Sequence, residues 1–299
     1  MRRLAVLGLT ACVGPTSAPP PPAPTVLTVW GAIGEPDGDR AVLWACTSGP
    51  AWVQGVVHSD SGVDVWSAVH ATDAAHDFAV SLPVEGLPQA ERLGWTVRAV
   101  PKSAGLAPVS IGEGAGTASG SARPIPHDNV FRVAIVGDLG GQGYCAPPGG
   151  YSVLDAVRHR APHVLVANGD MIYADGTCPP HAPDGQTNRP GAFRSVADPR
   201  VDWTDRGALD ALYFAHWRYN WGDRAMQELL ASTFYVGQWD DHEVINDFGA
   251  AWSAWHTKDP YRPGFSTLVD AGRGAFLAYT PHRDGPIHRQ LDWGPTAAL

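Results

Sequence analysis

Three aspartates stand directly after apolar runs of the sequence, and their spacing could create a metal site. The positions are Asp138 after residues 131–136, Asp170 after residues 163–167, and Asp241 after residues 233–239. Carboxylates gathered in a small volume repel one another, and a bound cation removes that repulsion. The pattern therefore predicts a centre for hard, oxygen-preferring ions such as Mn²⁺, Ca²⁺ or Fe³⁺.

The segments around these aspartates predict a parallel sheet that would bring them together. Residues 131–136 and 163–167 are continuous apolar runs, and residues 151–160 between them have helical spacing. Such a pattern is typical of a βαβ unit with buried strands. Residues 207–231 also have helical spacing, and residues 233–239 predict a third strand. Since the carboxyl ends of parallel strands share one edge, the aspartates should converge there.

Tyr173 narrows the choice of metal. It follows Asp170 by three residues, and its phenol has an ordinary pKa near 10, so it binds well only beside a strong Lewis acid. Fe³⁺ meets that need best. A purely structural interpretation is that each aspartate caps a helix or turn and the tyrosine simply packs. The recurrence after three strands favours the metal site.

The three motifs resemble those of a known superfamily. The sequences GDLG (137–140), GDMIY (169–173) and WDDHE (239–243) are similar to the first three motifs of the calcineurin-like metallophosphoesterases. The extended motif WDDHEVIND and the β-rich segment before the motifs resemble the alkaline phosphatase D family. Asp138 departs from that family, which usually has a cysteine there, and is similar instead to purple acid phosphatases.

The resemblance implies two metal ions and their ligands. Asp138 and Tyr173 would hold the first ion, expected to be Fe³⁺, and Asp170 would bridge both ions. Asp241 would hold the second ion at a position where most of the superfamily has asparagine. Its extra negative charge favours Ca²⁺ over Zn²⁺, with Mn²⁺ as a further candidate.

By the same resemblance, His242 would be the catalytic residue beside the substrate phosphate. Asp240 and Glu243 would orient His242 and the strand end. The implied activity is hydrolysis of phosphate monoesters or diesters by a metal-activated water. The substrate would be a small phosphate ester or a phospholipid head group. The alternative is a non-catalytic envelope lipoprotein that binds a partner through its β-sandwich and carries a decayed metal site.

The expected fold is an α/β (α+β) metallophosphoesterase sandwich, incomplete, preceded by a small all-β domain of immunoglobulin or fibronectin type. Short alternating strands separated by turns indicate the latter over residues 26–118. Residues 119–128 would be a linker, and residues 129–299 the N-terminal part of the catalytic domain. The superfamily's later histidine motifs have no match here, so we expect a truncated fragment in which activity can be lost.

Residues 1–25 predict export. Arg2 and Arg3 precede a short apolar run, and Cys12 completes a sequence that resembles a lipoprotein lipobox. A proline-rich tether would follow. Lipidation of Cys12 would place the protein at the cell envelope, and plain signal cleavage would make it secreted or periplasmic. In that oxidising setting Cys145 and Cys178 are expected to form a disulfide, leaving Cys46 as a buried thiol.

The composition argues against nucleic acid as a partner. The formal net charge is −9, and Lys102 and Lys258 are the only lysines. No basic stripe appears, as nucleic-acid binding would require. No apolar run is long enough to span a bilayer, so we expect membrane contact only through a lipid anchor.

Overall fold

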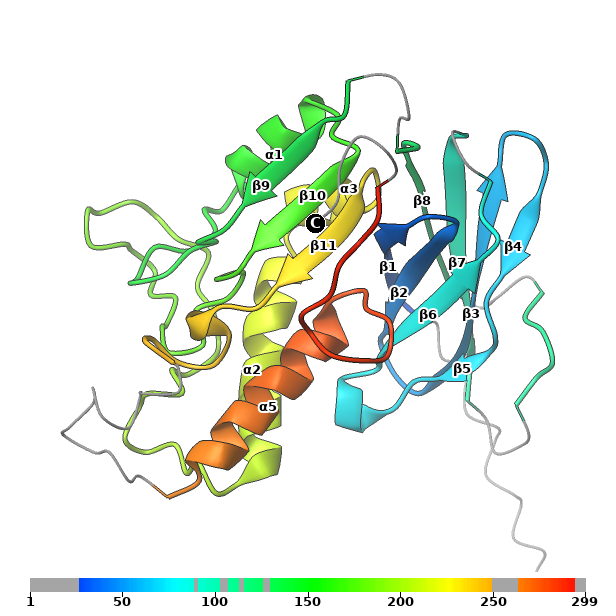
Figure 1. The fold of residues 1–299 in the computed structure, drawn as a ribbon. Helices are drawn as coiled ribbons and strands as arrows, with labels where there is room; N and C mark the ends of the chain where they lie inside the picture. The colour runs from blue at the N-terminus through cyan, green and yellow to red at the C-terminus, as the bar shows by residue number, and fades with distance from the viewer. Residues whose placement is uncertain are drawn as a thin grey trace, which may run out of the picture.

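The computed structural model describes residues 27–88, 91–102, 107–112, 116–125, 130–248 and 263–293, whose strands form two sheets (Figure 1). The expected export signal, Cys12 and the proline-rich tether lie outside these residues. Among the described helices, none combines the length and apolarity needed to cross a lipid bilayer.

The larger sheet has six strands in the order β6-β2-β1-β11-β10-β9. Their bounds are β1 (Val29–Asp37), β2 (Arg40–Thr47), β6 (Ala79–Glu85), β9 (Val133–Val136), β10 (Val164–Asn168) and β11 (Phe234–Gln238). Strands β9, β10 and β11 are parallel, as the sequence predicts. Strand β1 joins them through a parallel pairing with β11, and β2 and β6 extend the sheet antiparallel. The sheet is therefore mixed.

The second sheet is antiparallel and packs against the β1-β2-β6 part of the first. It contains β3 (Ala51–Ser59), β4 (Asp64–Trp66), β5 (His70–Ala71), β7 (Leu93–Pro101) and β8 (Gly116–Ala122). Buried side chains from both sheets, among them Leu43, Val53, Leu82 and Val97, share one core. The expected two-layer β packing is thus present, but one of its layers continues into the parallel sheet instead of closing a separate domain.

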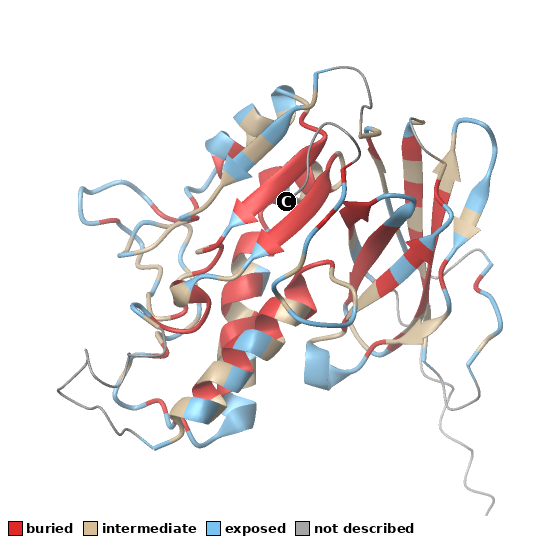
Figure 2. Ribbon diagram, viewed as in Figure 1, coloured by how far each residue is buried: buried red, intermediate tan, exposed pale blue. Residues whose placement is uncertain are grey.

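Four α-helices and two short 3₁₀ turns complete the described chain. They are α1 (Ser152–His159), α2 (Arg206–Trp221), α3 (Arg224–Leu230), α5 (Phe265–Tyr279), η1 (Ala74–His76) and η2 (Asp241–Glu243). Helices α2 and α5 lie side by side, and their buried faces turn toward the sheet (Figure 2). Aromatic rings of Trp217, Tyr235, Phe276 and Tyr279 build this core.

Three sequence expectations need correction. The segment expected as a linker from residue 119 begins inside β8. The helix expected over 207–231 is broken at Gly222, after which Asp223 caps α3 by accepting hydrogen bonds from two backbone amides. Strand β9 is not buried on both faces, because Ile135 is 69% exposed at the edge of the sheet. An apolar run indicates a strand, but it does not show whether that strand lies at the edge or in the centre of the sheet.

Candidate metal centre

The carboxyl ends of β9, β10 and β11 lie at one edge of the sheet and carry the acidic motifs. Asp138 and Asp170 have left-handed φ values of 54° and 53°, so the chain turns sharply as each strand ends. Gly169 precedes Asp170, and a Cβ atom there would lie 2.3 Å from the Cβ of Asp240. The glycine thus permits the β10 and β11 loops to approach closely.

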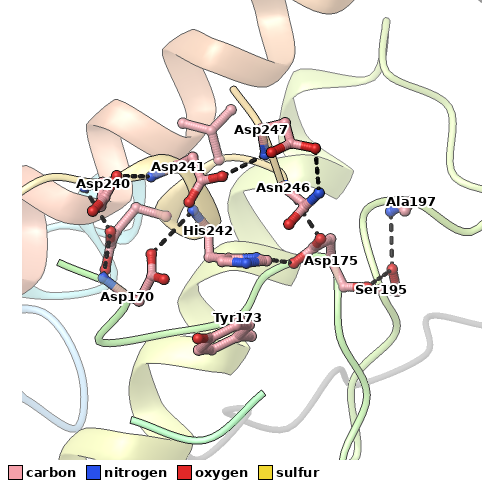
Figure 3. A network of polar contacts seen from close by, with 12 residues as sticks. Asp170, Tyr173, Asp175, Ser195, Ala197, Asp240, Asp241, His242, Asn246 and Asp247 are labelled. Carbon is pink, nitrogen blue, oxygen red and sulfur yellow. Dashed lines mark hydrogen bonds and ion pairs between the residues drawn. The ribbon is translucent and has the colours of Figure 1, made fainter. Parts of the chain in front are cut away.

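Ligand atoms of Asp170, Asp241 and His242 lie within 4.8 Å of one another (Figure 3). The His242 amide donates to the Asp170 carboxylate at 3.3 Å. Burial raises the pKa of Asp170 to about 6, and the charges of Asp241 and Asp240 add to that rise. A cation would relieve this crowding, so the donor set fits a metal ion.

Tyr173 connects this cluster to Asp138. Its hydroxyl donates to Asp138 Oδ1 at 3.0 Å, and its ring lies 4.0 Å from the His242 ring between centroids. Burial raises the pKa of Tyr173, and the Asp138 hydrogen bond and the Asp170 charge raise it further. The phenol therefore keeps its proton unless a strong Lewis acid displaces it. The four residues expected as ligands thus lie in one neighbourhood, with Asp138 joined through Tyr173 and not through the tight three-residue group.

Glu243 ties two loops of the centre together. It is fully buried and accepts hydrogen bonds from the amides of Asp170, Met171 and Asp240 at 3.1, 2.7 and 2.9 Å. Burial raises the pKa of Glu243 to about 7, although these three amides oppose the rise. Asp240 in turn accepts from the Asp241 amide. The two acidic residues thus orient the strand ends, and their described hydrogen bonds go to backbone amides and not to the His242 ring.

Asp175 is the residue that orients His242, and the sequence analysis missed it. His242 Nδ1 lies 2.7 Å from Asp175 Oδ1, and the Asn246 amide donates to the other oxygen at 3.2 Å (Figure 3). Burial alone would lower the pKa of His242, but the hydrogen bond and charge of Asp175 raise it overall. The available signal was proximity in sequence, since Asp175 follows Tyr173 by two residues.

Asn220, near the C-terminal end of α2, bonds two loops of the centre. The sequence analysis did not single it out either. Its amide donates to the carbonyls of Met171 at 2.6 Å and Leu139 at 3.4 Å, and it accepts from the Tyr151 hydroxyl at 2.8 Å. Leu139 and Met171 directly follow Asp138 and Asp170. One buried amide therefore fixes the two loops that carry expected ligands.

The expected disulfide is confirmed, and it borders the centre. Cys145 and Cys178 are bonded with their Cα atoms 5.7 Å apart, and Cys46 is a buried free thiol as expected. A cavity of about 400 Å³ is lined by Cys145 of the disulfide and by Asp138 and Tyr173 of the centre. Neutral polar residues line much of the rest, namely Gln142, Tyr144, Gln186, Thr187 and Asn188.

The mixed sheet and its acidic edge define a metallophosphoesterase-like fold beside an antiparallel sheet region. Residues 134–299 match the sequence family described as PhoD-like phosphatase, so the chain belongs to that family of metallophosphoesterases. The sequence resemblance to alkaline phosphatase D is thereby confirmed.

A solved structure shares the fold of this chain. The chain is similar to a structure of PhoD with a TM-score of 0.63 and 17% identity, over 90% of this chain and 50% of that one. It spans about half of that relative's length. A purple acid phosphatase, PPD1 from yellow lupin (Lupinus luteus), gives a TM-score of 0.46 and 14% identity, over 79% and 39% of the two chains. No curated protein matches the chain.

Proposed function

We propose that the chain contributes the centre of a phosphoesterase that hydrolyses phosphate monoesters or diesters with two bound metal ions. Asp138, Asp170, Tyr173 and Asp241 would hold the ions. The observation that carries the proposal is the convergence of Asp170, Asp241 and His242 within 4.8 Å in a chain of the PhoD-like phosphatase family. This crowding of charge has a chemical use only if cations occupy it.

The donor set supports Fe³⁺ as the first ion and Ca²⁺ as the second, with Zn²⁺ or Mn²⁺ as candidates for the same position. Tyr173, whose pKa is raised by burial and by Asp138 and Asp170, needs an ion as acidic as Fe³⁺ to lose its proton. When bound, such ions lower the pKa of a water nucleophile and neutralise charge on the phosphoryl group.

His242 would protonate the leaving oxygen of the substrate. Because its Nδ1 bonds Asp175, Nε2 is the ring atom left to deliver a proton. The negative charge of Asp175 stabilises the protonated ring, and the hydrogen bond fixes the ring's orientation. A positioned general acid of this kind contributes roughly 10²–10⁴-fold to the rate.

The cavity beside Asp138 supports a polar leaving group, since several neutral polar side chains line it. A small phosphate ester or a phospholipid head group fits that chemistry. We propose export to the envelope or periplasm, with Cys12 as the lipid anchor if it is modified. The disulfide supports an oxidising compartment, because such bonds rarely persist in the cytosol.

The test is turnover of p-nitrophenyl phosphate and bis-p-nitrophenyl phosphate by metal-loaded protein, with metal content measured in parallel. Asp170→Asn should lower bound metal and turnover by roughly a hundredfold, whereas Asp60→Asn on an exposed turn should change neither. Tyr173→Phe should abolish any visible charge-transfer band and weaken iron binding. Wild-type protein that binds no metal and hydrolyses neither ester would instead favour the non-catalytic lipoprotein.

A further inference from the structure

We propose that the protein has a second ligand site, remote from the metal centre, for an organic acid with a flat apolar body. The site is a cavity of about 570 Å³ between the two sheets and helices α2, α3 and α5. It includes Val29 to Gly31 of β1 and Ala231, which lies just before β11. Because β1 and β11 are parallel, this is the amino edge of the strands, opposite the acidic loops.

The size of the cavity points to a ligand. A space of about 570 Å³ falls within the range of sites for small organic molecules. Six aromatic residues contribute to its walls, namely Trp30, Trp44, Phe78, Trp95, Trp221 and Tyr279. Such walls favour a ring-containing body through apolar burial and offset stacking.

The polar part of the wall indicates an acidic group on the ligand. Arg218 is the basic residue among those lining the cavity, and its side chain is 52% exposed. Its Nη1 donates to one oxygen of Asp77, and the Tyr279 hydroxyl donates to the other. Asp77 is thus satisfied, while the guanidinium has five N–H donors and can still bind a carboxylate or sulfonate.

Trp95 is a fixed part of the cavity wall. It is 1% exposed, and its ring packs against Gly31 and Gly120, where a Cβ atom would lie only 2.8 and 2.6 Å from it. The two glycines thus leave room for a large aromatic ring to line the cavity between the sheets.

The experiment compares two fluorescent probes that share a ring system but differ in charge. They are 8-anilinonaphthalene-1-sulfonate, which is anionic, and N-phenyl-1-naphthylamine, which is neutral. Both should bind folded protein saturably at one site per chain, with quenching of tryptophan emission. Arg218→Gln should weaken binding of the sulfonate about tenfold and leave the neutral probe unchanged.

Matched variants separate this cavity from other surfaces. Arg224→Gln removes an exposed arginine outside the cavity and should change neither affinity. Ala118→Phe should fill the cavity and abolish binding of both probes, in protein whose circular dichroism and melting are retained. Asp170→Asn should leave both affinities unchanged, so the result is independent of phosphatase activity.

Three results would overturn the proposal. The first is no saturable binding of either probe by folded protein, as expected of a dry packing gap. The second is an equal loss of affinity for both probes in Arg218→Gln while the fold is retained. That result would show that Arg218 does not recognise an acidic group on the ligand. The third is unchanged binding in a folded Ala118→Phe variant, which would place the probes elsewhere.

Discussion

Asn220→Ala offers a direct test of how the fold positions the metal centre. Asn220 is 5% exposed and makes hydrogen bonds to Tyr151, Met171 and Leu139. Two of these bonds are short, at 2.8 and 2.6 Å. Each typically contributes about 1 kcal/mol, and leaving a buried partner unsatisfied adds about 1–3 kcal/mol. We expect the free energy of unfolding to fall by about 3 kcal/mol.

The assay is urea unfolding of metal-free protein, followed by a metal titration. Because Leu139 and Met171 follow the expected ligands Asp138 and Asp170, looser loops should weaken metal binding about 10–100-fold. Tyr151→Phe removes only one hydrogen bond of Asn220 and should lower the free energy of unfolding by about 1 kcal/mol. In the double variant, the two losses should fall short of additivity by about 1 kcal/mol.

The reasoning would be refuted by an Asn220→Ala protein within 0.5 kcal/mol of wild type that binds metal equally well. Full additivity with Tyr151→Phe would show that the two side chains act separately. Loss of stability with unchanged metal affinity would limit Asn220 to packing α2.

Three further predictions concern the rest of the described chain. Replacing Cys145 and Cys178 by serine opens a loop with a sequence separation of 33. This should cost about 4 kcal/mol in denaturant unfolding by the chain-entropy relation, and a loss below 1 kcal/mol would contradict it. Burial alone would raise the pKa of Asp37, but the Asp292 amide and Arg283 hold it below its ordinary 3.8. The contribution of Asp37 to the free energy of unfolding is therefore present above pH 3.8 and lost as pH falls through the folded pKa. The difference in the free energy of unfolding between wild type and Asp37→Asn should therefore narrow in acid. Burial raises the pKa of Cys46 to about 12, so a thiol reagent at pH 8 should label it only after unfolding, and rapid native labelling would contradict this.

Local sequence patterns predicted the elements that carry the chemistry. The apolar runs before Asp138, Asp170 and Asp241 are strands β9, β10 and β11, in parallel as expected. The prediction succeeded because each apolar run and the acidic residues that follow it are neighbours in the sequence. The Cys145–Cys178 bond was also foreseen, because both residues follow strands of the same sheet.

Long-range contacts account for what the sequence did not predict. Strand β8 contains GTASGSA, a composition typical of a linker. Yet at Gly120 a Cβ atom would lie 2.2 Å from the Ala231 carbonyl, so the strand needs glycine to pack there. Asp175 and Asn220 resemble ordinary loop and helix polar residues until the fold brings His242 and Met171 to them.

The parallel pairing of β1 with β11 has a practical consequence for protein engineering. Ile33 and Gly34 pair with Phe234 and Tyr235, so a fragment cut at residue 129 would lose the neighbour of a buried strand. Its freed backbone groups and apolar side chains would form a template for strand addition between molecules. Researchers who wish to shorten this chain should therefore expect insoluble product from such a cut, and should retain the β1–β2 hairpin even when only the metal-binding half is wanted.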